Sequence, residues 1–152
     1  MPPQKDLHAA AVLLARDAFI TAFGAGHCVR DQLPLQLGKW SEPEPDIAVV
    51  PGSPRDYIGT GHPTGALLVV EVSDATLRFD RRTKLGLYSK YAIDDYWIIN
   101  LIDKHVEVYR EPVPDPGHPF GHRYGSMTVY KRGQSIQPLA RSSPVRVDDL
   151  LP

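Results

Sequence analysis

The sequence holds a single cysteine, Cys28, among its 152 residues, and no apolar run approaches the length of a membrane span. One cysteine leaves no internal disulfide and no cysteine-based zinc site. The short apolar runs predict no membrane-spanning helix and no membrane partner. The N-terminal residues MPPQKDLH lack the basic-then-apolar pattern of a secretory signal, so we expect a cytoplasmic protein.

The chain also lacks a strong excess of either charge. Its 17 Lys and Arg residues nearly cancel its 18 Asp and Glu residues, which gives a net charge of −1. This balance argues against a surface that is basic all over, but it allows a local basic patch. One such patch is the segment TLRFDRRTK, which contains Arg78, Arg81, Arg82 and Lys84. A solvated helix start is the simpler explanation of its three arginines.

Proline is abundant, with 15 residues clustered between the expected elements. These prolines indicate loops rather than a disordered chain, because the apolar fraction of 42% is ordinary for a folded protein. A chain of this length buries roughly 70% of the surface that its unfolded form exposes, so it can build its own core. We therefore expect a single domain over residues 1–152.

Helical and strand periodicities alternate along the chain. The stretch from Asp6 to Phe23 is rich in alanine and leucine and precedes Gly24, so it predicts a helix. A second helix is expected over residues 76–92, and a long loop over residues 111–121. Apolar alternation and short apolar runs predict strands over residues 27–37, 46–50, 66–73, 96–101, 105–110 and 122–130. The order indicates one sheet flanked by helices, an α/β or α+β domain.

Two carboxylates occupy comparable points of two strongly apolar strands. Asp46 begins the strand PDIAVV, and Glu71 stands near the end of LLVVEVS. If these strands are antiparallel neighbours, both side chains meet at one rim of the sheet. Two buried carboxylates would repel each other unless a cation lay between them. A hard divalent ion, Mg²⁺ or Mn²⁺, prefers such ligands together with waters and a backbone carbonyl, for which Val72 is the candidate.

The second predicted helix supplies a cation for the same place. Lys84 falls on the same side of a helical wheel as Tyr88 and Tyr91, apparently the side turned toward the sheet. A lysine there could orient an attacking water and stabilise charge that develops on a phosphate. Tyr88 is the aromatic residue expected to reach the cleft. The alternative for this lysine is a stem that lies along the surface with its ammonium in water.

These segments together resemble a known family. PDIAVV, LVVEVSDATLRFDRRTKLGLYSKYAIDDYWIINL and VEVYR are similar to the Uma-type restriction endonuclease family, within the PD-(D/E)XK nuclease superfamily. The resemblance covers roughly Pro45 to Arg110. It implies a restriction-endonuclease-like fold: a mixed central sheet, flanked by helices, whose two central strands present the acidic residues.

The resemblance also implies roles for individual residues. Asp46 matches the aspartate of the PD element, and Glu71 matches the second acidic residue. The superfamily usually carries a lysine two residues later, where this chain has Ser73, so Lys84 becomes the substitute from the following helix. Asp80 matches a recurring aspartate of the family, although a helix-dipole partner explains it equally well. Ser73 has a simpler explanation too, as a cap of that helix.

The function that we expect is Mg²⁺-dependent hydrolysis of phosphodiester bonds in DNA. Asp46, Glu71 and Lys84 would be catalytic, and the segment Arg78–Arg82 would contact phosphates, which gives affinity without sequence choice. Sequence specificity would then require a homodimer or another partner. The alternatives are a catalytically inactive nuclease fold that binds nucleic acid or protein, and a hydrolase of other phosphate esters. The six histidines form no convincing site, and we expect His8 to be exposed in the first turn of its helix.

Overall fold

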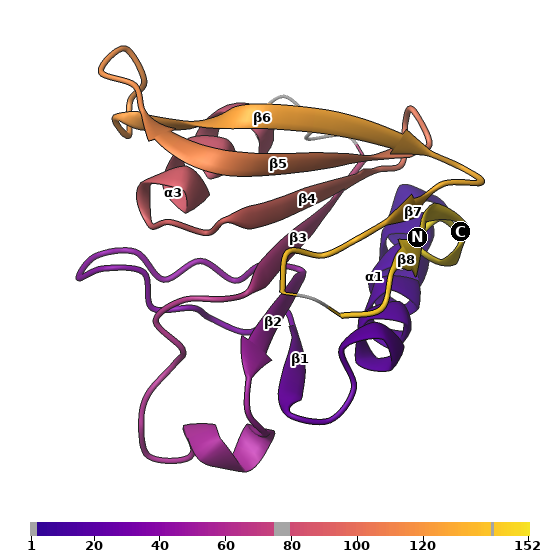
Figure 1. Ribbon diagram of the computed structural model, residues 1–152, viewed down its shortest axis with the longest axis horizontal. Helices are drawn as coiled ribbons and strands as arrows, with labels where there is room; N and C mark the ends of the chain where they lie inside the picture. The colour runs from indigo at the N-terminus through magenta and orange to yellow at the C-terminus, as the bar shows by residue number, and fades with distance from the viewer. Residues whose placement is uncertain (1–2, 75–79, 141) are drawn as a thin grey trace.

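A mixed six-stranded sheet forms the centre of the molecule (Figure 1). The computed structural model describes residues 3–74, 80–140 and 142–152. The strands lie side by side in chain order; they are β1 (His27–Asp31), β2 (Ile47–Pro51), β3 (Leu68–Ser73), β4 (Asp95–Asn100), β5 (His105–Pro114) and β6 (His122–Lys131). Strands β3 and β4 run parallel, whereas every other neighbouring pair runs antiparallel. The mixed sheet that the family resemblance implies is confirmed.

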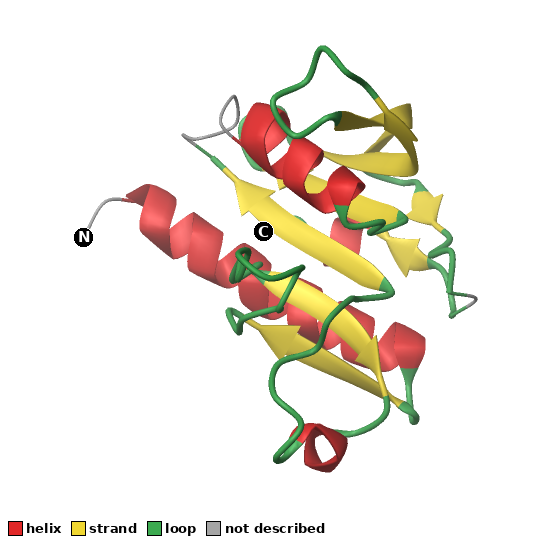
Figure 2. Cartoon of the chain, turned by 90° about the vertical axis from the view of Figure 1, so that its left-hand side faces the viewer, coloured by secondary structure: helices red, strands yellow, loops and turns green. Residues whose placement is uncertain are grey.

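Helices cover both faces of this sheet (Figure 2). Helix α1 (Pro3–Phe23) packs on one face, where Phe19 contacts Trp97 of β4 edge to face. The short helix α3 (Leu85–Lys90) packs on the other face and directly continues a π-helical turn, Asp80–Lys84. We refer to the two resulting apolar clusters as the α1-side core and the α3-side core.

The central strands are apolar without alternation because both of their faces are covered. All six residues of β3 are buried, and so are the first four residues of β2. Alternation along β3 sends Val70 and Val72 into the α1-side core and Val69 into the α3-side core. Glu71 therefore faces α3, which places a carboxylate inside an otherwise apolar layer.

The predicted strand over residues 27–37 is wrong in its second half. Strand β1 stops at Asp31 because Gln32 takes a positive φ of +52°, which turns the chain out of the sheet. Leu35 and Leu37 are nevertheless fully buried in the α3-side core. Their alternation with polar residues thus reflects burial of a loop rather than a strand, a distinction that periodicity alone cannot make.

The loop predicted over residues 111–121 is wrong at its start, since β5 continues through its first residues and pairs with β6. Within β5, Glu111 has a φ of +61°. The pairing of β5 with β6 is interrupted there and begins again at Pro112. Beyond Arg110, β5 no longer pairs with β4. Pro112 and Pro114 of β5 therefore lie at an edge of the sheet, where prolines are tolerated. The kink leaves Tyr109 and Tyr124, on either side of it, in the same α3-side core.

The helix expected over residues 76–92 is shorter and less regular in the described part of the chain. Residues 75–79 lie outside the described residues, the π-helical turn follows, and α3 ends at Lys90. Ala92, with a φ of +56°, then leads the chain toward β4. Tyr88 points into the α3-side core as the wheel predicts.

The remaining elements are short and lie beside the main layers. A 3₁₀ turn (Pro54–Tyr57) interrupts the loop between β2 and β3. After β6, a small two-stranded sheet and a 3₁₀ turn pack against the α1-side core. The sheet pairs β7 (Ser135–Ile136) with β8 (Val145–Arg146), and the turn covers Val147–Asp149. Within residues 3–74, 80–140 and 142–152, no helix is long and apolar enough to cross a membrane.

Candidate active site

The antiparallel pairing of β2 and β3 brings Asp46 to Glu71. Ile47 pairs with Val70, so continuing this register by one residue places the two carboxylate-bearing residues opposite each other. The Oδ2 atom of Asp46 accepts a hydrogen bond of 2.8 Å from the backbone N–H of Val72. Both carboxylates therefore lie at the same end of the two central strands, as the sequence pattern predicts.

Glu71 is almost completely buried, with 2% of its surface exposed. Its two oxygens have separate partners: the Tyr88 hydroxyl donates to Oε1 at 2.9 Å, and the ammonium Nζ of Lys84 lies 3.1 Å from Oε2. Burial raises the pKa of the Glu71 carboxyl to about 7, although the Lys84 ammonium opposes the shift. A nearby second carboxylate, Asp46, raises this pKa further.

Lys84 and Tyr88 reach Glu71 because they stand four residues apart, one helical turn, across the junction between the π-helical turn and α3. Lys84 remains partly exposed, so its ammonium joins the buried carboxylate to the solvent-accessible side of the site. Burial, followed by the charge of Glu71, raises the pKa of the Tyr88 hydroxyl. The hydroxyl therefore stays protonated and acts as a fixed donor. Such π-helical turns often occur at functional sites.

His8 also belongs to this cluster, so the prediction that it is exposed is wrong. Its Nε2 atom lies 3.3 Å from Oδ2 of Asp46, and its side chain is partly buried rather than exposed. A signal for this position exists in the sequence: His8 stands three and four residues before Ala11 and Val12, which form the buried stripe of α1. A histidine on that stripe faces the sheet, and near the start of α1 it meets the end of β2.

The described residues offer a pair of carboxylates to a metal ion here. Among the described residues, no group of three or more His, Cys, Asp and Glu side chains is arranged to hold one. The pair still fits a hard divalent cation, which binds through one or two carboxylates and keeps several waters. The Val72 N–H points at Asp46, and the carbonyl of a strand residue lies on the same side as its N–H, so that carbonyl is a further candidate ligand. A buried carboxylate with a raised pKa gains most from a cation.

Of the accessory candidates Ser73 and Asp80, the structure describes the side chain of Ser73 only. Ser73 is fully buried, and among the described residues its Oγ atom has no hydrogen-bond partner. It lies on the Glu71 side of β3, two residues further along. The side chain of Asp80 and the whole of Arg78 lie outside the described part, so their predicted roles stay predictions.

Arg81 is engaged in an ion pair within the protein. Its Nε atom donates to Oε1 of Glu107 at 3.1 Å, and a second guanidinium nitrogen reaches the other oxygen. Glu107 is buried and accepts further hydrogen bonds from Asn100, His105 and Tyr109. Although burial alone would raise the pKa of Glu107, these donors, led by Arg81, lower it to about 2. The pair fixes the π-helical turn to β5.

Substitutions at two adjacent arginines test whether the Arg81–Glu107 pair anchors the π-helical turn. We expect Arg81→Ala to lower the free energy of unfolding by roughly 2 kcal/mol, because Glu107 would lose its strongest partner but keep three others. Arg82 is exposed, and Arg82→Ala, which removes the same charge, should change stability by less than about 0.5 kcal/mol. Urea denaturation of both variants measures the difference. Equal stabilities would show that the buried pair does not hold the turn.

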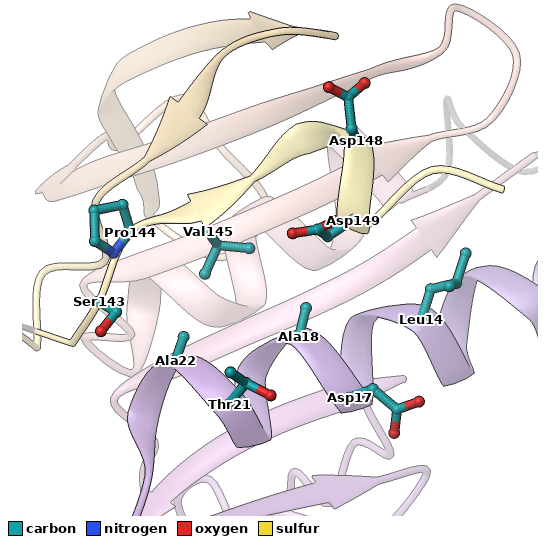
Figure 3. Close-up of a pocket in the computed structure, with 10 residues that line it drawn as sticks. All are labelled: Leu14, Asp17, Ala18, Thr21, Ala22, Ser143, Pro144, Val145, Asp148 and Asp149. Carbon is teal, nitrogen blue, oxygen red and sulfur yellow. The ribbon is translucent and has the colours of Figure 1, made fainter.

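A groove on the opposite side of the molecule has the wrong charge for a nucleic acid. It lies between α1 and the C-terminal segment and has a volume of about 440 Å³ (Figure 3). Three aspartates, Asp17, Asp148 and Asp149, line it, and the described lining residues include no lysine or arginine. Their charge would repel phosphates. The acidic pair under α3 is therefore the better candidate.

The sheet, the flanking helices and the paired carboxylates at the end of the central strands place the protein in a nuclease-like fold class. A crystal structure described as "a putative nuclease belonging to DUF820 from Anabaena variabilis ATCC 29413" has this fold, with a TM-score of 0.64 and 14% sequence identity, over 94% of this chain and 79% of that one. The chain belongs to the Uma2 family, described as "Putative restriction endonuclease", whose model matches residues 1–140. A comparison with curated proteins finds no match. Family and fold together support a nuclease.

Proposed function

We propose that the protein is a Mg²⁺-dependent endonuclease that hydrolyses phosphodiester bonds of DNA. The observation that carries this proposal is the convergence of three charged groups from separate parts of the chain. They are the carboxyl of Glu71, the carboxylate of Asp46 and the ammonium of Lys84. Burying an ionised carboxylate is costly unless hydrogen bonds, ion pairs or a metal ion compensate its charge, and a buried carboxyl whose pKa is strongly raised is a candidate functional group.

Asp46 and Glu71 would hold the metal ion, with the Val72 carbonyl as a further ligand and Mn²⁺ as an alternative ion. Such an ion lowers the pKa of a bound water and neutralises charge on the phosphate when it is present. Lys84 approaches Glu71 from the partly exposed side of the site and would orient the attacking water. Its ammonium would also stabilise the negative charge that develops on the phosphate.

Two further side chains would keep the carboxylates in place. The Tyr88 hydroxyl occupies Oε1 of Glu71 and so limits rotation of that carboxylate. His8 and the Val72 N–H both meet Oδ2 of Asp46, which leaves its other oxygen to turn toward Glu71. Such partners of metal-binding groups typically affect metal affinity or activity by about 10–100-fold. We regard both as positioning residues.

The rival proposal is a silent member of the family that binds DNA without cutting it. Supercoiled plasmid incubated with the protein and Mg²⁺ or Mn²⁺ decides between them. We expect conversion to nicked and linear forms that stops when EDTA removes the ion. A plasmid that stays supercoiled at every concentration of both ions, yet is retarded in a gel by the protein, would overturn the nuclease proposal and favour the rival.

A further inference from the structure

A second pocket lies on the α3 face, beyond the acidic pair. It has a volume of about 380 Å³ and is bounded by the π-helical turn, α3, β5, β6 and the loop between those strands. Its polar side is formed by Arg81, Arg82, His118 and Arg123, and none of the described lining residues is a carboxylate. We call it the arginine pocket. An anionic ligand is the chemistry that three guanidinium groups accept.

The arginines differ in how tightly they are already held. Arg81 is fixed by the buried Glu107 and still has guanidinium N–H groups that face away from that carboxylate. Arg123 lies 3.6 Å from Asp115, and both side chains are substantially exposed, so this pair is weak. Arg82 is exposed to solvent. The pocket thus combines one preorganised cation with two that can turn toward a ligand.

The other side of the pocket is apolar. Leu85 and Met127 line it together with the edge of the stacked tyrosine cluster that includes Tyr124. Met127 exposes 54% of its surface, so its flexible thioether side chain is accessible to a ligand at this wall. A cationic wall opposite an apolar and aromatic wall matches a nucleotide, whose phosphate is charged and whose base is flat and apolar on its faces.

The distance between the arginine pocket and Glu71 would allow a single DNA strand to contact both. The π-helical turn supplies Arg81 to the pocket and Lys84 to Glu71. The pocket lies over β5 and β6, two to three strand spacings from β3, roughly 10–15 Å. At a rise of about 3.4 Å per nucleotide, that distance corresponds to three or four nucleotides.

From this arrangement we infer that the arginine pocket binds one unpaired nucleotide of a DNA strand, a few positions from the bond that is cut. This inference rests on the proposed function for its substrate. The pocket volume is at the lower end of the range for small-molecule sites and accommodates a single nucleotide. The base must leave the duplex to contact the apolar wall, so the pocket favours single-stranded or locally opened DNA.

Binding measured without hydrolysis tests the inference. Fluorescence anisotropy with a short 5′-labelled oligothymidine is followed in EDTA, where no metal-dependent cleavage takes place. We expect Arg82→Ala and Arg123→Ala each to weaken binding about tenfold, as the loss of a charge-assisted hydrogen bond predicts. Met127→Glu, which puts a carboxylate on the apolar wall, should weaken it at least as much. All three side chains are exposed or rim residues, and thermal melting verifies that the variants fold.

Matched controls separate the pocket from general charge effects and from the nuclease proposal. Arg55→Ala removes the same charge from the loop between β2 and β3, far from β5 and β6 in Figures 1 and 2, and should leave binding unchanged. Unchanged binding of oligothymidine by Arg82→Ala and Arg123→Ala would overturn the inference, and so would equal losses on a fully paired duplex. Because this assay contains no Mg²⁺, a wild-type protein that binds through the pocket but never nicks plasmid would refute the nuclease proposal alone.

Discussion

Replacing Glu71 with glutamine is expected to abolish metal-dependent cleavage of DNA, with a nicking rate at least about 10³-fold lower, because several kcal/mol of transition-state stabilisation depend on the bound ion. The amide has nearly the same shape as the carboxylate and can still accept the hydrogen bond from the Tyr88 hydroxyl. It carries no charge, however, and is a poor ligand for Mg²⁺. The measurement is the initial rate of supercoiled plasmid nicking in Mg²⁺ and in Mn²⁺.

Glu42→Gln is the matched control, since it makes the same chemical change at an exposed glutamate that only approaches His62, at 3.8 Å. Its nicking rate should equal that of the wild-type protein. A Glu71→Gln variant that nicks plasmid at the wild-type rate would remove the central residue from the proposed site.

Stability measurements exclude unfolding as the cause of any loss. The pKa of Glu71 is raised to about 7 in the folded protein from an ordinary value of 4.5, so the folded state binds its proton more tightly than the unfolded state. Its contribution to stability is therefore full below pH 4.5 and is lost as the pH rises to about 7. Without metal, Glu71→Gln should be more stable than the wild-type protein at pH 8, by up to about 3 kcal/mol. Glu107, with its pKa lowered to about 2, behaves oppositely and loses its contribution as the pH falls below 4.5.

The opposite shifts of these two glutamates distinguish a site from an anchor. Both are buried on the α3 face and both touch a basic residue of the π-helical turn. Glu107 accepts hydrogen bonds from five donor groups and is stable as an anion. Glu71 has two partners for its two oxygens and a second carboxylate nearby, so its negative charge is under-compensated. Under-compensated charge is what a divalent cation relieves.

Much of the candidate site could be predicted because its parts follow from local patterns. An acidic residue at one end of each of two apolar strands needs only antiparallel pairing to bring Asp46 and Glu71 together. The helical wheel places Lys84 and Tyr88 on one side of the predicted helix. Both side chains still reach Glu71 although Lys84 lies in a π-helical turn, because a small change of helical pitch moves residues four apart only slightly relative to each other. That one sheet is flanked by helices follows from the same strand and helix periods, whereas the mixed pairing of its strands was implied only by the family resemblance.

The rest depends on contacts between residues distant in sequence. The buried stripe of α1 indicates that His8 faces the sheet, but its meeting with Asp46 depends on the angle at which α1 crosses the sheet, which the helix sequence does not specify. Arg81 meets Glu107 over 26 residues, and the strand pattern HVEVYR gives no reason to expect that glutamate to be buried. Gln32 and Glu111 take positive φ values that few such residues adopt, so their effects on β1 and β5 could not be foreseen.

Replacing Lys84 with methionine, which keeps most of the side-chain volume, is expected to lower the nicking rate about 10²–10³-fold, the usual cost of losing one preorganised charge at a transition state. The change should also move the pH dependence. The Lys84 ammonium lowers the pKa of the Glu71 carboxyl against the dominant effect of burial, so its removal raises that pKa above about 7. Residual activity should therefore reach half of its maximum at a higher pH than in the wild-type protein. Lys90→Met, at an exposed lysine at the end of α3, is the control and should change neither quantity.

A second test moves the positive charge from Lys84 to Ser73 on β3. Ser73 lies on the same side of β3 as Glu71, about 7 Å further along, and its buried Oγ atom has no hydrogen-bond partner among the described residues. A lysine there has a stem long enough to bring its ammonium toward Oε2 of Glu71, the atom from which Lys84→Met removes a positive charge. We expect Ser73→Lys combined with Lys84→Met to regain at least about tenfold in nicking rate over Lys84→Met alone, since the charge rather than its place in the chain lowers the barrier. A folded double variant that stays as inactive as the single one would show that Lys84 acts through the shape of the π-helical turn instead.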